Sequence, residues 1–421
     1  MKKPAPSRSR GTTVGAPSRA GSPLKTRGQD GAKVNARVGK HRAKAGSQAA
    51  EPSASAPDRV AISPQGTRDT HTRNPGAAVK PGFRKGAEKE KKAKDPNPRP
   101  YADLSPDLIL DAVDSLGLHT DGRLLALNSY ENRVYQIGIE DSPPLIAKFY
   151  RPQRWTDAAI LEEHGFTLDL TALEIPAIAP LIIAGQTLHT HGGYRFSLSP
   201  RRGGRPPELG NPQVLTWIGR FLGRIHAYGA SAPFRHRPIL DIATFGEQPR
   251  RFLVDLGWLP VELRSVYAGV SAQALDEVRR LFDLAGPLIQ LRLHGDCHAG
   301  NLLWTDTGPH FVDFDDCRMG PAVQDLWMLL SGNREEMAVQ LGWLLAGYED
   351  FRDFDRRELN LVEALRTLRL IHYSAWIARR WQDPAFPLAF PWFNTQRYWQ
   401  DRILELREQI AAMQEGPLPA P

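Results

Sequence analysis

The chain has 421 residues, and 54 Lys and Arg against 47 Asp and Glu give it a formal net charge of +7. That length is enough for two domains or for one large domain with two lobes. Two cysteines in the whole chain exclude a disulfide framework and predict a reducing, cytoplasmic location. We see no apolar run that would make a secretory signal or a membrane span, and we predict neither.

The positive charge is concentrated in the first part of the sequence. Residues 1–100 carry 23 Lys and Arg against 7 Asp and Glu, a net of +16, whereas residues 101–421 carry 31 against 40, a net of −9. The first hundred residues are rich in Ser, Pro, Gly and Ala, and Phe83 is their only aromatic residue. Because such a segment buries too little apolar surface to offset the entropy of ordering, we predict a disordered basic tail. Weak contact with nucleic acid and a solvated extension without a partner both remain open for it.

Residues 101–205 are predicted to form a small lobe built on an antiparallel sheet. Ser105 followed by Pro106 is typical of a helix start, and Gly117 is placed to end that helix. A second helix is expected from Thr156 to about Leu170. Strands are expected at 124–127, 133–139, 145–150, 181–183 and 194–199.

Residues 206–415 are predicted to form a larger, mainly helical lobe. The apolar periodicity predicts helices at 214–228, 272–285, 323–331, 334–347, 356–381 and 394–413. A sheet-based lobe followed by a helical lobe is an α+β architecture with two lobes. We expect the protein to be a monomer.

The stretch from Arg292 to Asp316 carries the clearest chemical signal. An apolar run leads into the sequence His-Gly-Asp that ends at Asp296, and a predicted hairpin turn at 306–308 returns the chain to Asp313. The hairpin is expected to bring Asp296, Asn301 and Asp313 together. Two carboxylates and an amide suit a general base beside Mg²⁺. Asp, then Asn five residues on, then Asp twelve residues further is the order in a phosphotransferase catalytic loop.

Lys148 stands out by composition. Residues 101–421 contain 30 arginines and this single lysine. Kinases use a lysine on the third strand of the small lobe to hold the α- and β-phosphates and to pair with a glutamate of the next helix. Glu162 and Glu163 are both candidates for that pair, and the helical spacing slightly favours Glu163. Survival of one surface lysine by chance is the alternative.

The loop at 128–133 is expected to cover the nucleotide phosphates. It lacks the Gly-x-Gly-x-x-Gly pattern of protein kinases. The hydroxyl of Ser129 and the backbone N–H groups remain able to bind phosphate oxygens. Taken by itself this is a weak signal.

The motif His294-Gly295-Asp296-x-His298-x-x-Asn301 with Asp313-Phe314-Asp315 resembles the aminoglycoside phosphotransferase and choline kinase superfamily, which has a protein-kinase-like fold. Similarity to the bacterial stress-response serine/threonine protein kinases of this fold extends from about Leu127 to Pro387. The tail is not part of the resemblance.

The resemblance implies an ATP- and Mg²⁺-dependent serine/threonine protein kinase that acts on protein hydroxyls, including its own. It implies that Asp296 accepts the proton of the hydroxyl, that Asn301 and Asp313 bind Mg²⁺, and that Asp313 is also catalytic. Ser129, Lys148 and Glu163 would then form the ATP site. The resemblance also implies a structural role for Asp325, whose carboxylate would bind the backbone of the catalytic loop.

Three alternatives share parts of this pattern. A small-molecule kinase of the choline, homoserine or aminoglycoside kind has the same catalytic residues. A pseudokinase would bind nucleotide without turnover, although the complete set of residues argues against it. A metal hydrolase would use His294, Asp296 and His298 as ligands, but the sequence shows no further motif with ligand spacing.

Overall fold

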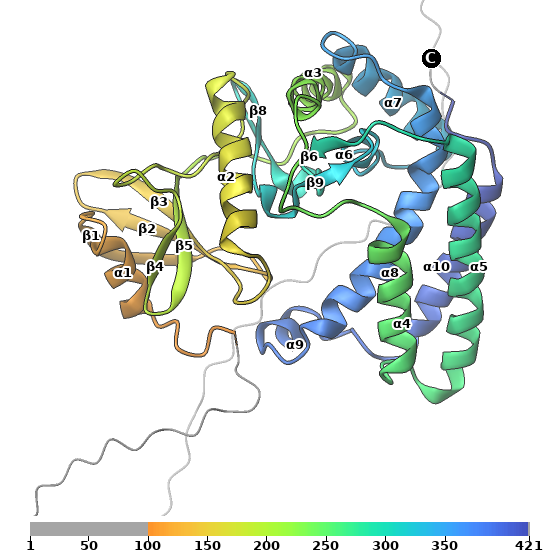
Figure 1. Ribbon diagram of the computed structural model, residues 1–421, viewed down its shortest axis with the longest axis horizontal. Helices are drawn as coiled ribbons and strands as arrows, with labels where there is room; N and C mark the ends of the chain where they lie inside the picture. The colour runs from red at the N-terminus through yellow and green to blue at the C-terminus, as the bar shows by residue number, and fades with distance from the viewer. Residues whose placement is uncertain (1–99, 420–421) are drawn as a thin grey trace, which may run out of the picture. The chain divides into compact units, whose positions relative to one another are not determined.

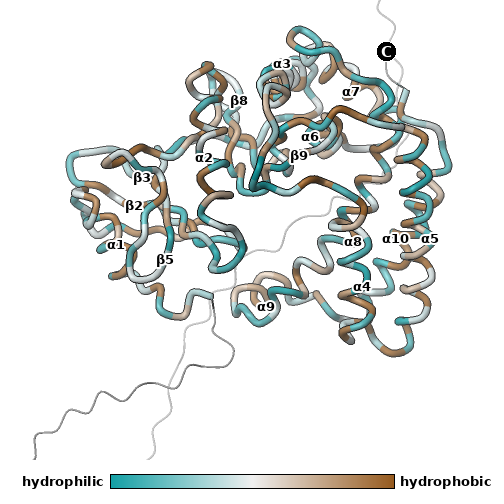
Figure 2. The backbone as a smooth tube through the Cα atoms, in the orientation of Figure 1, coloured by the Kyte–Doolittle hydropathy of each residue, from teal (hydrophilic) through white to brown (hydrophobic). Residues whose placement is uncertain are grey.

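The computed structural model describes residues 100–419, so that the predicted basic tail lies outside the described residues apart from Pro100. The described part is α+β, with an antiparallel sheet first and helices after it, as predicted (Figure 1). Among these residues no helix combines the length and the apolar composition that a membrane span requires. In Figure 2 the long helices on the right of the view carry both hydrophilic and hydrophobic residues.

One antiparallel sheet of five strands forms the first lobe, in the order β1–β2–β3–β5–β4. The strands are β1 (Thr120–Ala126), β2 (Arg133–Ile139), β3 (Ser142–Phe149), β4 (His189–His191) and β5 (Tyr194–Pro200). Helix α1 (Pro106–Asp114) packs its buried residues Ile109 and Val113 into the same core as Ile137, Phe149 and Phe196 of the sheet. Helix α2 (Asp157–Ala172) carries Glu162 and Glu163.

The predicted strand at 181–183 is wrong. Ile183 makes only an isolated bridge to Gln186, because Ala184 and Gly185 both have positive φ (49° and 78°) and turn the chain at once. The fifth strand of the sheet is instead β4, which the sequence did not predict.

Helices make up most of the second lobe. They are α3 (Pro212–Gly229), α4 (Gln248–Asp255), α5 (Val261–Ala285), α6 (Gln324–Trp327), α7 (Arg334–Tyr348), α8 (Val362–Arg379), α9 (Ala385–Ala389) and α10 (Gln396–Gln414). Helices α3 and α7 approach closely because Gly223 faces α7: a Cβ there would lie 2.4 Å from the carbonyl oxygen of Tyr348. Trp399 and Tyr348 are among the fully buried side chains of this core.

Some predicted helix bounds need correction. The helix expected at 323–331 is the single turn α6, and the one expected from residue 272 begins at Val261, directly after Pro260. The segment Arg356–Leu361 forms a 3-10 helix before α8 begins. Helices α4 and α9 were not predicted, because both are short and their apolar residues show no extended period.

Candidate active site

The catalytic loop lies between two short antiparallel pairs of strands. Strand β6 (Leu291–Leu293) pairs with β9 (Arg318–Gly320), and β7 (Leu302–Thr305) pairs with β8 (Gly308–Phe311). The backbone N–H of Val312 donates to the carbonyl of Asn301 at 3.0 Å, which extends the β7–β8 hairpin by one bond. This bond fixes Asn301 beside the residue that precedes Asp313, as the hairpin predicts.

Asp325 supports the backbone at the start of the catalytic loop. Its carboxylate is fully buried and accepts hydrogen bonds from the N–H groups of His294 at 2.7 Å and Gly295 at 2.8 Å. His226 contacts the same carboxylate at 3.1 Å. Gly295 has φ +84°, and a Cβ there would lie 2.2 Å from the carbonyl oxygen of Asp316. The loop therefore requires glycine at this position.

Asp313 lies at the end of the hairpin in a left-handed backbone conformation, with φ 61° and ψ 63°. A non-glycine residue rarely adopts this conformation, and such positions concentrate at functional sites. The next residue, Phe314, is buried, and its ring centroid lies 4.4 Å from that of His294. The packing of Phe314 thus anchors the backbone that presents Asp313.

Lys148 on β3 is surrounded by three carboxylates. Its Nζ lies 3.1 Å from Asp313, 3.2 Å from Asp315 and 3.6 Å from Glu163. Burial alone would lower the pKa of Lys148, but the three negative charges hold that pKa well above its ordinary value. Lys148 is therefore a fixed cation next to the residue expected to bind metal.

The structure places Glu163, and not Glu162, beside Lys148. Glu162 points away and accepts hydrogen bonds from the backbone N–H groups of residues 235–237 at 2.6–3.1 Å. The two adjacent glutamates on α2 thus have different partners, and Glu163, which helical spacing slightly favours, is the one beside Lys148.

Arg154 contacts the acids that follow Asp313, and nothing in the sequence distinguishes it from the other arginines. Its guanidinium bonds to Asp315, reaches Asp316 at 2.9 Å and lies 3.6 Å from Glu131 of the loop at 128–133. Burial would raise the pKa of Asp315, but Arg154 and Lys148 hold it at about 2. Asp315 is therefore an ionised, paired carboxylate where protein kinases have glycine.

Asp296 also has a partner that the sequence did not reveal. Nη1 of Arg369, on α8, donates to Asp296 at 2.6 Å, and Nε2 of His298 lies 3.4 Å from the other carboxylate oxygen. Burial would raise the pKa of Asp296, but His298 and Arg369 together hold it below its usual range. The proposed base is ionised at neutral pH, as an acceptor must be.

The loop at 128–133 is tied to the end of α8. Glu131 accepts from Nε1 of Trp376 at 2.7 Å and pairs with Arg380. Ser129 donates its hydroxyl to the carbonyl of Asn132 at 3.0 Å, inside the loop. These contacts give the loop a defined shape without the glycines of the protein-kinase pattern.

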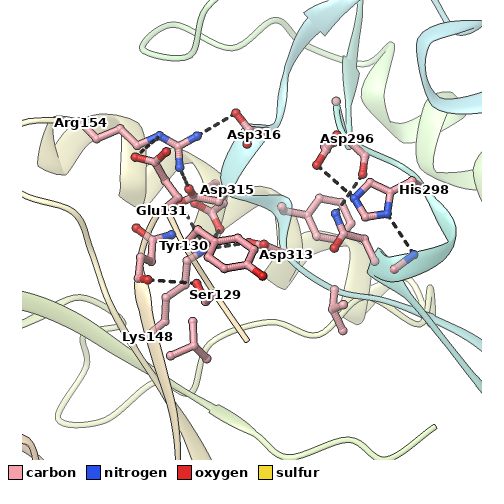
Figure 3. Close-up of a pocket in the computed structure, with 18 of the residues that line it drawn as sticks. Ser129, Tyr130, Glu131, Lys148, Arg154, Asp296, His298, Asp313, Asp315 and Asp316 are labelled. Carbon is pink, nitrogen blue, oxygen red and sulfur yellow. Dashed lines mark hydrogen bonds and ion pairs between the residues drawn. The ribbon is translucent and has the colours of Figure 1, made fainter. Parts of the chain in front are cut away.

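All of the predicted site residues line one cleft of about 930 Å³. They are Ser129, Lys148, Glu163, Asp296, Asn301 and Asp313. In Figure 3, Asp296 and His298 lie on one side of the cleft, Lys148 and Arg154 lie on the other, and Asp313 lies between them. Val134, Ile146 and Leu303 add an apolar surface to the lining. The cleft thus offers a flat apolar region and a polar end, which suit a base and its phosphates.

The polar end fits a hard divalent cation. Asn301 donates its Nδ2 to the carbonyl of Asp296 at 3.0 Å, so its amide oxygen is left as an acceptor. Asp313 is 56% exposed, and Lys148 contacts only one of its oxygens. Within residues 100–419 there is no cluster of three or more His, Cys, Asp or Glu with metal-binding geometry. Mg²⁺ usually takes only one or two carboxylates and fills its shell with phosphates and water.

Both cysteines are free and buried next to this site. Burial raises the pKa of Cys317 to about 12 and that of Cys297 well above its ordinary value. Neither thiol has the thiolate character of a reactive cysteine.

The sequence profile of the phosphotransferase enzyme family (APH) matches residues 123–362, and the chain belongs to this family. Stress response kinase A of Escherichia coli K12 is 45% identical over 318 residues, which cover 76% of this chain and 96% of that protein. The Salmonella typhimurium protein named serine/threonine protein kinase RdoA is 44% identical over 320 residues, with the same coverage.

Solved structures of the same fold belong to enzymes named for small substrates. An amicoumacin kinase in complex with AMP-PNP, Ca²⁺ and Ami has a TM-score of 0.58 at 18% identity, and the match covers 75% of this chain and 95% of that one. An aminopropanol kinase has a TM-score of 0.54 at 17% identity, covering 72% and 96%. At these identities the likeness establishes the fold.

Proposed function

We propose that this protein is an ATP- and Mg²⁺-dependent serine/threonine protein kinase of a bacterial stress response. The observation that carries the choice of a protein acceptor is the similarity to stress response kinase A over 96% of its length. The solved structures named as amicoumacin kinase and aminopropanol kinase are only 18% and 17% identical. The site geometry supports phosphoryl transfer in either case.

Each role rests on a contact within the cleft. Asp296 would accept the proton of the hydroxyl and orient it for in-line attack, held in position by Arg369 and His298. Asn301 and Asp313 would hold Mg²⁺, which when bound neutralises charge on the phosphates. Lys148, fixed by Glu163 at 3.6 Å, would hold the α- and β-phosphates. The loop containing Ser129 would cover them.

The test is transfer from γ-labelled ATP with Mg²⁺, with the protein alone and with bacterial extract. Label on the protein itself or on other proteins is the expected result, and label confined to small molecules would support the alternative instead. Asp296→Asn keeps the size of the side chain but removes the base, so we expect transfer to fall by about 10²–10⁴-fold while nucleotide binding is retained. A variant with a rate near that of the wild type would disprove the role of Asp296.

A further inference from the structure

One face of α8 runs along the cleft. Residues at intervals of three or four lie on the same side of a helix. Such a series runs along α8 and the residue directly after it: Arg366, Arg369, Tyr373, Trp376 and Arg380. Trp376 and Arg380 bind Glu131 of the loop at 128–133. Arg369 binds Asp296, so the Arg366 end of this face lies on the side of the proposed base away from that loop.

A side pocket of about 350 Å³ adjoins Asp296 at that end of α8. It shares His298 and Arg369 with the main cleft, and Arg366, Trp327 and Ser331 also line it. Among the described residues no carboxylate lines this side pocket. Residues 101–421 have a net charge of −9, whereas the lining of the side pocket holds two arginines and a histidine. The side pocket is therefore more basic than this part of the chain as a whole.

The two arginines retain hydrogen-bonding capacity. Arg369 is 41% exposed and uses only Nη1 on Asp296; within residues 100–419 its Nε and Nη2 have no partner. Arg366 is 27% exposed, and its Nη1 lies 3.4 Å from Glu363, which is 11% exposed and lines a different pocket, near the end of α10. Its Nη2 makes only a weak bond, at 3.5 Å, to the sulfur of Met337. A guanidinium with a free edge can bind a carboxylate or a phosphate through two parallel bonds.

We infer that the side pocket binds an acidic group of the substrate, on the far side of Arg369 and His298 from the hydroxyl that receives the phosphoryl group. The acceptor is then a Ser or Thr in an acidic segment of a protein. This inference rests on the proposed function and names its substrate class. A cationic amine at the same place would be repelled by Arg369, which contacts the proposed base Asp296, whereas an acidic residue would be attracted. By the same reasoning the protein's own tail, with a net charge of +16, is a poor acceptor.

The experiment uses the full chain and synthetic peptides with one serine that differ only in its neighbours: Glu, phosphoserine, Ala or Lys. At saturating ATP and Mg²⁺ we expect kcat/KM to be at least tenfold higher for the Glu peptide than for the Ala peptide, and lowest for the Lys peptide. A phosphoserine peptide that exceeds the Glu peptide would assign the pocket to a primed substrate. Equal values for the four peptides, or a preference for Lys, would overturn the inference.

Arg366→Gln tests the pocket without altering the proposed catalytic residues. We expect KM for the Glu peptide to rise about tenfold, while KM for ATP and kcat/KM for the Ala peptide stay unchanged. Arg397→Gln is the matched control, since Arg397 is 90% exposed on α10 and is not among the residues that line the cleft or the side pocket. An equal loss for all peptides would mean that Arg366 acts on folding or transfer and not on recognition.

Binding separates this inference from the proposed function. A fluorescent Glu peptide with Ala in place of the serine should bind the wild type in a salt-sensitive manner and should bind Arg366→Gln at least tenfold more weakly. If no peptide is phosphorylated but this difference in binding is found, the protein kinase proposal fails and the acidic pocket stands. If the peptide does not bind, the pocket inference fails whatever the kinase assay shows.

Discussion

Two groups of charges hold the loops of the cleft, and they differ in their balance. In the catalytic cluster, the cations Lys148, Arg154 and Arg318 face four carboxylates, those of Glu163, Asp313, Asp315 and Asp316. In the second group, the interlobe pairs, Glu131 pairs with Arg380, and Asp383 pairs with Arg133 and Arg151 at 2.9 Å each. The first group has an excess of one negative charge, and the second has an excess of one positive charge.

The difference in charge balance indicates which group is suited to bind a ligand. An excess of negative charge that includes the exposed carboxylate of Asp313 favours a divalent cation, and burial together with Asp315 raises the pKa of Glu163 in spite of Lys148. The carboxylates of the interlobe pairs are only 3% and 12% exposed and are already matched by arginines. We therefore expect changes in the catalytic cluster to alter turnover, and changes in the interlobe pairs to alter how firmly the loop at 128–133 is held.

The largest effect is expected for Asp313→Asn. The amide removes one negative charge and a proposed metal ligand, while Asn tolerates the positive φ of this position. Transfer should fall about a thousandfold, about 4 kcal/mol of transition-state stabilisation, with a higher midpoint for Mg²⁺. Rates from γ-labelled ATP across a Mg²⁺ titration measure both, and a melting curve checks the fold. A rate within tenfold of the wild type would place the metal elsewhere.

The next effect, on stability, is expected for Arg154→Met. This change leaves Asp315 and Asp316 without their shared cation, and Asp315 is only 4% exposed. Loss of one partner from a buried pair costs about 3–5 kcal/mol, so the unfolding free energy at pH 7 should fall by about 3 kcal/mol. Urea unfolding measures it. Arg220→Met is the control, because Arg220 and Asp350 are both about half exposed and their pair should contribute less than about 1 kcal/mol.

The same variant has a signature in acid. The pKa of Asp315 is about 2 in the folded protein against an ordinary 3.8, so this group contributes stability above pH 3.8 that is lost as the pH falls through 2. Without Arg154 that pKa rises, and the variant should lose less stability than the wild type between pH 5 and about 3. If the unfolding free energies of the two proteins fall in parallel with pH, Arg154 does not lower the pKa of Asp315.

The sequence was sufficient for the parts of the site that are local in the chain. Asp296, Asn301 and Asp313 fall in one stretch with a turn of known type, and Lys148 was conspicuous as a lone lysine. All of these residues line one cleft, which agrees with the prediction that they lie close together. Their chemical roles remain predictions that the variants above test.

The sequence was insufficient for the pairs that cross the chain. Arg369 is 73 residues from Asp296, and Asp383 is 250 residues from Arg133. In a body with 30 arginines, nothing marks these individual residues as partners of particular acids. One signal was available: the arginines and aromatics of α8 at intervals of three and four residues form a polar-aromatic face on a helix that is otherwise buried.

A smaller effect on turnover is expected for Lys148→Arg. The charge is kept, but the planar guanidinium is wider than the ammonium group that fits among three carboxylates within 3.6 Å. Transfer should fall at least tenfold, about 1.4 kcal/mol, with little change in melting temperature. The reverse swap Arg397→Lys, at an exposed position, is the control and should change neither quantity. Full activity in Lys148→Arg would show that the lone lysine is generic charge.

The smallest effect, and the sharpest test of the comparison, is expected for Glu131→Gln. Glu131 bonds to Trp376 and Arg380 and makes no contact with Asp313 or Lys148. Its contact with the catalytic cluster is Arg154 at 3.6 Å, so the variant should loosen the loop at 128–133 with little change at Lys148 and Asp313. We expect KM for ATP to rise about threefold, about 0.6 kcal/mol, with kcat unchanged. Arg380→Gln should do the same, and the double variant should cost no more than either single variant, with a coupling of about 0.6 kcal/mol. Additive effects would mean that the pair does not act as a unit. A fall in kcat as large as the rise in KM would mean that the interlobe pairs stabilise the transition state and not only the bound nucleotide. The interlobe pairs would then belong to the catalytic machinery.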